Sequence, residues 1–149
     1  MTAGPPTRIA IDHDDHHAEH VGRTADGRQF FLTTPFEPAG DDDEGQEFVA
    51  LFLFEGSGRF LEARIDALGP RARLDQVAAR ATYEGRLASL GDVTFTRIEV
   101  EPFSVDRFGT TFGLIPEPPE DDGDDWWVIL EPGDYMAFCP PWDSGEYDT

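Results

Sequence analysis

All four histidines of the chain lie in one short acidic segment near its start. The segment runs from Asp12 to His20 and reads Asp-His-Asp-Asp-His-His-Ala-Glu-His. Imidazole and carboxylate groups are the usual ligands of Zn and other divalent transition metals. In a helical segment, His13, His16, His17 and His20 would share one face, because residues three and four apart are neighbours on a helix. The sequence therefore makes these four histidines candidate metal ligands, and a metal-dependent enzyme using the cluster is one hypothesis for its function.

The cluster departs from two hydrolase motifs, and simpler interpretations stay open. A zincin helix needs Glu directly after its first His, whereas Asp14 follows His13 here. The His-x-His-x-Asp-His run of metallo-β-lactamase-like hydrolases is also absent. A dense local cluster can bind metal adventitiously or form a solvated segment. Stoichiometric metal in untagged protein, with a melting temperature that responds to Zn or Ni, would support the functional site.

Other patterns that resemble reactive or ion-binding motifs are incomplete. The acidic run before Gly45 places its glycine one residue too early for an EF-hand, and residues 121–125 have the wrong order. Residues 56–58 lack the nucleophile elbow, and Leu61 replaces the last glycine of a dinucleotide-binding pattern. Cys139 is typical of a small buried hydrophobic residue rather than a reactive thiol. We therefore predict no catalytic residue and no cofactor site outside the histidine cluster.

The charge of the chain restricts its partners. It contains 31 Asp and Glu residues and 11 basic residues, all of them Arg, which gives a formal net charge of −20. The absence of Lys removes P-loop, Schiff-base and lysine general-base chemistry. A surface this acidic repels the phosphate backbone of nucleic acids and the surface of anionic membranes. We therefore expect neither nucleic acid nor a membrane as a partner. A basic protein would be steered towards it, unless the charge serves only solubility.

Length and composition predict one domain over residues 1–149, with residues 1–6 frayed. The 149 residues include 12 Phe and three Trp, enough to form a hydrophobic core rather than a disordered chain. The single Cys139 cannot form an internal disulfide, and residues 1–20 lack an apolar signal region. The apolar run Phe48–Phe54 is far too short to span a membrane. These features favour a cytoplasmic protein.

Local patterns predict an α+β fold: a mainly antiparallel twisted sheet of about seven strands, packed with one helix. Asp26-Gly27 separates β-forming stretches at 21–24 and 28–35, which predicts a hairpin. Residues 48–55 are apolar on both faces, which predicts a central buried strand. Further β-rich stretches occur at 59–67, 93–101, 110–115, 126–130 and 135–138.

The helix is expected over about residues 71–90. Pro70 suits its first turn and Gly91 its C-terminal cap. Leu74, Val77, Ala78, Ala81 and Ala88 fall near helical spacing, which predicts that they form the buried face. Gly85 costs about 1 kcal/mol relative to Ala inside a helix, so the helix needs the sheet beneath it.

The end of the chain combines turn residues with two large aromatic side chains. Trp142 and Tyr147 alternate with acidic residues, among them Asp143 and Asp148. Their apolar area favours docking over disorder. The tail therefore either packs on the sheet or offers an aromatic and acidic patch, formed by Trp142, Asp143, Tyr147 and Asp148, to a protein partner.

Several stretches carry a resemblance to a known group. They are residues 25–31, the tail Pro-Trp-Asp-x-Gly-x-Tyr-Asp-Thr, and the intervening Pro102-Phe103, Phe112-Gly113-Leu114 and Asp125-Trp126. Over about residues 20–149 the chain resembles small actinobacterial proteins labelled formate hydrogenlyase regulatory protein. The resemblance implies a regulatory role and supplies no catalytic residues. Together with the charge, it favours a non-enzymatic regulatory or inhibitory module, a regulator or an immunity-type protein, that binds a basic partner.

Overall fold

A computed structural model describes residues 6–13, 19–38, 45–121, 123–133, 136–139 and 142, together with the backbone of 145–147. Within these ranges, thirteen strands form three sheets in which every pairing is antiparallel, accompanied by one α-helix and one 3-10 turn. The α+β class, with mainly antiparallel strands and one helix, is therefore confirmed. The expected number of about seven strands is wrong, because short strands escaped detection and one expected strand is divided between two sheets.

The largest sheet has six strands and contains both of the elements predicted most directly from local sequence. Its order is β4 (Phe36–Glu37), β5 (Gln46–Phe54), β3 (Gln29–Thr33), β2 (His20–Thr24) and β7 (Val93–Phe95), with β6 (Phe60–Gly69) paired to β5. The predicted hairpin joins β2 to β3, and Gly27 takes the positive φ of 87° that its turn requires. The predicted central strand is β5, in which Phe48–Phe54 are all buried.

The other two sheets account for most of the strands that were not expected. Five strands follow the order β13 (Gly145–Tyr147), β12 (Met136–Phe138), β11 (Trp127–Glu131), β10 (Thr110–Glu117) and β9 (Phe103–Arg107). A two-stranded sheet pairs β1 (Ile9–Ile11) with β8 (Ile98–Val100). The stretch expected as one strand over 93–101 is thus split into β7 and β8, which belong to different sheets.

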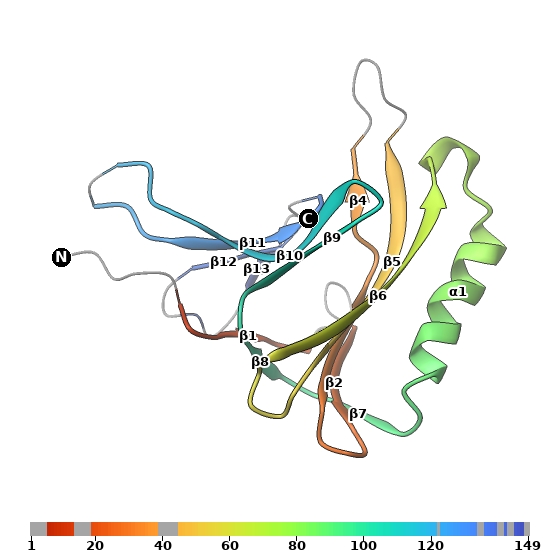
Figure 1. Cartoon of the computed structure of the whole chain (residues 1–149), viewed down its shortest axis with the longest axis horizontal. Coiled ribbons are helices and arrows are strands. Elements are labelled where there is room, and N and C mark those ends of the chain that lie inside the picture. The colour runs from red at the N-terminus through yellow and green to blue at the C-terminus, as the bar shows by residue number, and fades with distance from the viewer. Residues whose placement is uncertain are drawn as a thin grey trace.

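The molecule has three layers, with the five-stranded sheet, the six-stranded sheet and the helix α1 (Gln76–Ala88) side by side (Figure 1). Alternate residues of β5 point to opposite faces of the sheet. Phe48, Phe52 and Phe54 belong to the main core, which side chains of both large sheets share. Val49 and Leu51 belong to a smaller core on the opposite face, against which α1 packs.

The helix begins later than the sequence predicts. Pro70 precedes a 3-10 turn over Arg71–Arg73, and Leu74 then returns to an extended conformation. The carboxylate of Asp75 accepts hydrogen bonds from the backbone N–H groups of Val77 and Ala78, at 3.0 and 3.1 Å. An Asp at this position satisfies two of the unpaired N–H groups of the first turn. The expected range of 71–90 is therefore too long, and α1 starts after the Asp75 cap.

The predicted buried face of the helix is also wrong. No residue of α1 is fully buried, and Val77 is 81% exposed. Tyr83 and Leu87 instead pack against the smaller core, together with the buried Leu90. The C-terminal half of α1 is thus attached to the sheet, while its N-terminal half leaves apolar side chains open. No helix in the described ranges is long and apolar enough to cross a membrane.

Candidate functional site

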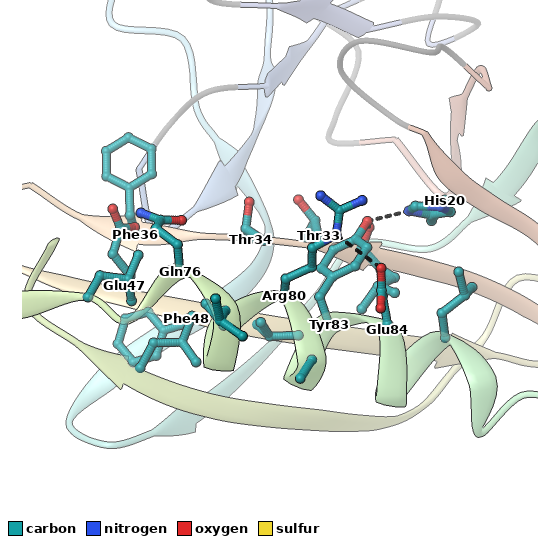
Figure 2. Close-up of a pocket in the computed structure, with 18 of the residues that line it drawn as sticks. His20, Thr33, Thr34, Phe36, Glu47, Phe48, Gln76, Arg80, Tyr83 and Glu84 are labelled. Atoms are coloured by element: carbon teal, nitrogen blue, oxygen red, sulfur yellow. Dashed lines mark hydrogen bonds and ion pairs between the residues drawn. The ribbon is translucent and has the colours of Figure 1, made fainter.

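A groove of about 1440 Å³ lies between α1 and the six-stranded sheet (Figure 2). Leu32 of β3, Val49 of β5 and Leu68 of β6 line the sheet side. Small and apolar residues of α1, among them Val77 and Ala81, line the helix side. The site is therefore a groove between the helix and the sheet, with apolar side chains on both sides.

The groove is open because α1 is anchored at only one half. Arg86, in the last turn, binds Asp66 of β6 through two hydrogen bonds of 2.7 and 3.0 Å. The hydrogen bonds that it donates to Asp66 raise the pKa of Arg86, so the guanidinium stays charged. In the first half of α1, Ala79 and Ala81 contribute side chains too short to fill the space above the sheet.

One end of the groove holds a hydrogen-bonded pair of aromatic side chains. The Tyr83 hydroxyl of α1 shares a hydrogen bond with Nδ1 of His20 in β2, and the two ring centroids are 5.2 Å apart. Tyr83 also lies 3.5 Å from the carbonyl oxygen of Leu32, to which its hydroxyl can donate. On the other side of the imidazole, Nε2 of His20 lies 3.8 Å from a carboxylate oxygen of Glu19. Helix and sheet are thus joined here by polar groups.

Burial keeps both members of this pair neutral near pH 7. Desolvation lowers the pKa of His20, with Glu19 opposing the shift and His13 adding to it. Burial also raises the pKa of Tyr83 well above its usual range, and the charge of Glu19 acts in the same direction. Tyr83 is therefore not a phenolate nucleophile. The pair supplies a neutral hydrogen-bonding end to the groove.

Charged residues at the rim of the groove are arranged as ion pairs. Arg71 binds Glu47 of β5 and lies over the ring of Phe36, with its guanidinium carbon 5.5 Å from the ring centroid. Arg80 binds Glu84 one turn further along α1, at 3.1 Å. The side chains of Arg71 and Arg80 are 74% and 81% exposed. The side chain of Glu84 is 62% exposed, whereas that of Glu47 is only 13% exposed, so the Arg80–Glu84 pair is the more exposed of the two. An exposed pair such as Arg80–Glu84 contributes about 0–1 kcal/mol.

Arginine–carboxylate ion pairs also occur elsewhere on the described surface. Within the described ranges, several arginines form ion pairs with carboxylates, among them Arg28, Arg64, Arg71, Arg80, Arg86 and Arg97. The chain contains 31 acidic residues, so carboxylates greatly outnumber the arginines that could neutralise them. The surplus negative charge therefore faces solvent and potential partners.

The structure describes two of the four predicted metal ligands. His13 stacks on Phe95 with ring centroids 5.8 Å apart, and His20 meets the same ring edge-on at 5.3 Å. His16 and His17 lie outside the described residues. Among the residues that are described, no three or more His, Cys, Asp or Glu side chains form a group that could hold a metal ion. The four-histidine metal site stays a prediction.

The predicted partner-binding tail is described in part. Trp142 is half-buried against the main core, and its carbonyl oxygen accepts a 2.9 Å hydrogen bond from the N–H of Ala10. The backbone of β13 pairs with β12, so this part of the tail docks on the five-stranded sheet. Asp143, Asp148 and the side chain of Tyr147 lie outside the described part of the chain. A partner-binding role for these four residues stays a prediction.

No protein-family model matches the chain, and comparisons with curated proteins and with solved structures also give no match. Function is therefore inferred from the groove and its charges. Sequence patterns missed this groove because its two sides come from segments far apart in the chain. Neither the capping Asp75 nor the small residues that follow it in α1 indicate a groove on their own.

Proposed function

We propose that the protein is a non-enzymatic binding module, a cytoplasmic regulator or immunity-type inhibitor, that holds a segment of a basic protein partner in the α1 groove. One observation carries the proposal: a large apolar groove with carboxylates at its rim stands open on a chain of net charge −20. The resemblance of residues 20–149 to proteins labelled as regulators agrees with it. The lone Cys139 agrees with a reducing compartment.

The apolar lining supports a role in binding. Exposed apolar surface that is rimmed by polar groups is typical of an interaction site. Val77 exposes 81% of its surface beside the groove, and Leu68 is only partly buried. Covering such surface contributes about 25 cal/mol per Å² removed from water. A partner segment with apolar side chains would therefore gain affinity from this groove.

The charges support a basic partner. Glu47 and Glu84 hold Arg71 and Arg80 in ion pairs at the rim. A cationic residue of a partner can replace Arg80 at small cost, because its ion pair with Glu84 is exposed and exposed ion pairs are weak. The net charge adds long-range attraction, which increases the association rate at low salt. Selectivity for basic segments follows from both effects.

The polar end of the groove supports binding rather than catalysis. His20 is neutral, its Nδ1 is occupied by Tyr83, and its Nε2 faces Glu19. Both ring nitrogens are thus directed at residues of the chain itself. The same groups can exchange hydrogen bonds with the end of a bound segment.

The proposal is tested with synthetic peptides that carry apolar residues together with Lys and Arg, with Glu and Asp, or with neutral polar residues. We expect the basic peptides to bind tightest, with an affinity that falls as salt is added. Val77→Asp, inside the groove, should weaken binding at least tenfold. Leu61→Asp introduces the same carboxylate at a 44% exposed leucine outside the groove lining and should leave affinity within twofold. Equal binding of acidic peptides, or equal effects of both variants, would contradict the proposal.

A further inference from the structure

The backbone around the groove indicates what form a bound segment takes. Resting on the proposed binding function, we infer that the groove receives an amphipathic α-helix whose flanks carry Lys or Arg. The helix lies on the six-stranded sheet beside α1, with its apolar stripe against the sheet. Backbone pairing, groove size and the positions of the rim charges each favour this occupant.

The floor of the groove presents side chains rather than free backbone groups. β3 pairs with β2 on one side and with β5 on the other, and β5 in turn pairs with β6. β3 and β5, the central strands under the groove, therefore have neighbours along both edges, and an extended peptide cannot add to either of them as a further strand. A segment placed on this face must satisfy its own N–H and C=O groups. An α-helix does so internally, whereas an extended segment does not.

The size of the groove suits a helix. Its volume of about 1440 Å³ exceeds the roughly 300–1,000 Å³ of pockets for small ligands. Ala79 and Ala81 are short residues on the α1 side. Small side chains allow two helices to approach closely, at interaxial distances of about 8–10 Å. α1 already packs on this sheet, and a second helix would extend the same layer.

The rim charges place cations towards both ends of the bound helix. Glu47 lies near Phe36 at one end of the groove, while Glu84 lies near His20 at the other (Figure 2). Leu68 is partly buried and Val77 is 81% exposed, so both offer apolar surface that a helix would cover. A helix with an apolar stripe and a Lys or Arg towards each end matches this arrangement. Each cation would displace Arg71 or Arg80 from its carboxylate.

This displacement predicts opposite effects from the two members of each rim pair. Glu84→Gln removes a carboxylate that the bound helix would use, so it should weaken binding several-fold. Arg80→Gln frees Glu84 for the incoming cation and should strengthen binding several-fold. Glu62→Gln and Arg64→Gln alter an equivalent pair on β6, at 2.9 Å and outside the groove lining, and serve as matched controls.

The probe is a peptide of about 14 residues, or four helical turns, with Leu at helical spacing and Lys at the remaining positions. Two comparison peptides keep its charge: a scramble of the same composition, and a version with a central Pro that breaks the helix. We expect the helical peptide to bind at least tenfold tighter than both, and its helicity to rise on mixing with the full chain. Glu84→Gln and Arg80→Gln should shift its affinity in opposite directions, with both control variants within twofold of wild type.

The results distinguish the helical form of the bound segment from the more general proposal of a basic partner. Equal, salt-dependent binding of all three peptides would overturn the helical occupant and leave the basic-partner proposal standing. No salt-dependent binding of any basic peptide would overturn both. Tighter binding of the helical peptide that responds equally to groove and control variants would place its site elsewhere and overturn the groove as the helix-binding site.

Discussion

The side-chain amide of Gln29 and the backbone of Glu99 exchange two hydrogen bonds of 2.8 Å, although the residues are 70 positions apart in the chain. Gln29 is almost completely buried in β3, and Glu99 belongs to β8. The same amide nitrogen lies 3.3 Å from the carbonyl oxygens of Glu55 and Gly56. One buried side chain thus joins the six-stranded sheet, the small two-stranded sheet and the turn after β5.

Gln29→Met keeps the approximate shape of this side chain and removes its hydrogen bonds. The N–H and C=O groups of Glu99 would lose these partners, and a buried unsatisfied polar group costs about 1–3 kcal/mol. We expect urea denaturation to show a loss of about 2–4 kcal/mol in the free energy of unfolding. Gln46→Met, at a half-buried position of β5, serves as the control. A loss of the same size in both variants would contradict the structural role assigned to Gln29.

Substitution of Gly85 or Gly91 by Ala changes the backbone preference at each position without a change in packing. A Cβ atom at either position would meet nothing within 4 Å, but Gly85 is helical whereas Gly91 has a φ of +72°. Gly85→Ala should raise the free energy of unfolding by about 0.5–1 kcal/mol, because Gly costs this much inside a helix. Gly91→Ala should lower it by about 1 kcal/mol, since L-residues are strained at positive φ. Thermal melts of both variants check the two signs; a shift in the same direction for both would refute the argument.

Phe108 occupies a turn position that suits Asn. Arg107 and Thr110 are paired in β9 and β10, so Phe108 and Gly109 form a two-residue hairpin loop, with φ values of 54° and 73°. Both values are typical of a type I′ turn, in which Asn-Gly is strongly preferred. Phe108 is 62% exposed, and its ring stacks loosely on Phe48 with centroids 6.2 Å apart.

Phe108→Asn should therefore raise the free energy of unfolding by about 0.5–1 kcal/mol. The gain comes from relieving a left-handed conformation that costs L-residues about 1–2 kcal/mol, and lost ring contact offsets part of it. Phe95→Asn removes another partly exposed ring, one that contacts His13, His20 and Phe30, and should be destabilising. If Phe108→Asn destabilises the protein in urea denaturation, the stacking on Phe48 outweighs the backbone strain.

The parts of the fold that sequence patterns predicted correctly depend on local chemistry. Gly27 supplies a turn conformation that few other residues allow, and the two-sided apolar run of β5 has no stable alternative to burial. The start of α1 was misplaced because Pro70 and Asp75 are both good helix-start signals, and only the second caps α1. The split of residues 93–101 has a long-range cause: β7 pairs with β2, whereas β8 pairs with β1.

The candidate site was much less predictable than the fold. Composition directed attention to the histidines, yet His20 owes its place in the groove to Tyr83, which lies 63 positions away. The apolar spacing of Val77 and Ala81 predicted a buried face, because no local signal shows that α1 is attached mainly through its C-terminal half. A groove is a gap between distant segments, and periodicity within one segment cannot reveal it.

The partly buried imidazole of His20 should make stability depend on pH. Burial lowers the pKa of His20 in the folded state below its unfolded value of 6.5, so the unfolded chain binds the proton more readily. Stability should therefore be fully present above pH 6.5 and fall as the pH drops through and below that value, until His20 also becomes protonated in the folded state. His20→Asn removes this titration and leaves the other histidines in place.

The measurement is urea denaturation of wild type and His20→Asn from pH 8 to pH 5 at constant ionic strength. We expect the free energy of unfolding of wild type to fall more steeply below pH 6.5 than that of the variant. The Tyr83→Phe variant should shift the whole curve down by about 0.5–1.5 kcal/mol at pH 8, because it removes the hydroxyl that binds His20. Parallel pH profiles for wild type and His20→Asn would show that burial does not shift this imidazole. A steeper fall in His20→Asn would show that the carboxylate of Glu19, rather than desolvation, controls its pKa.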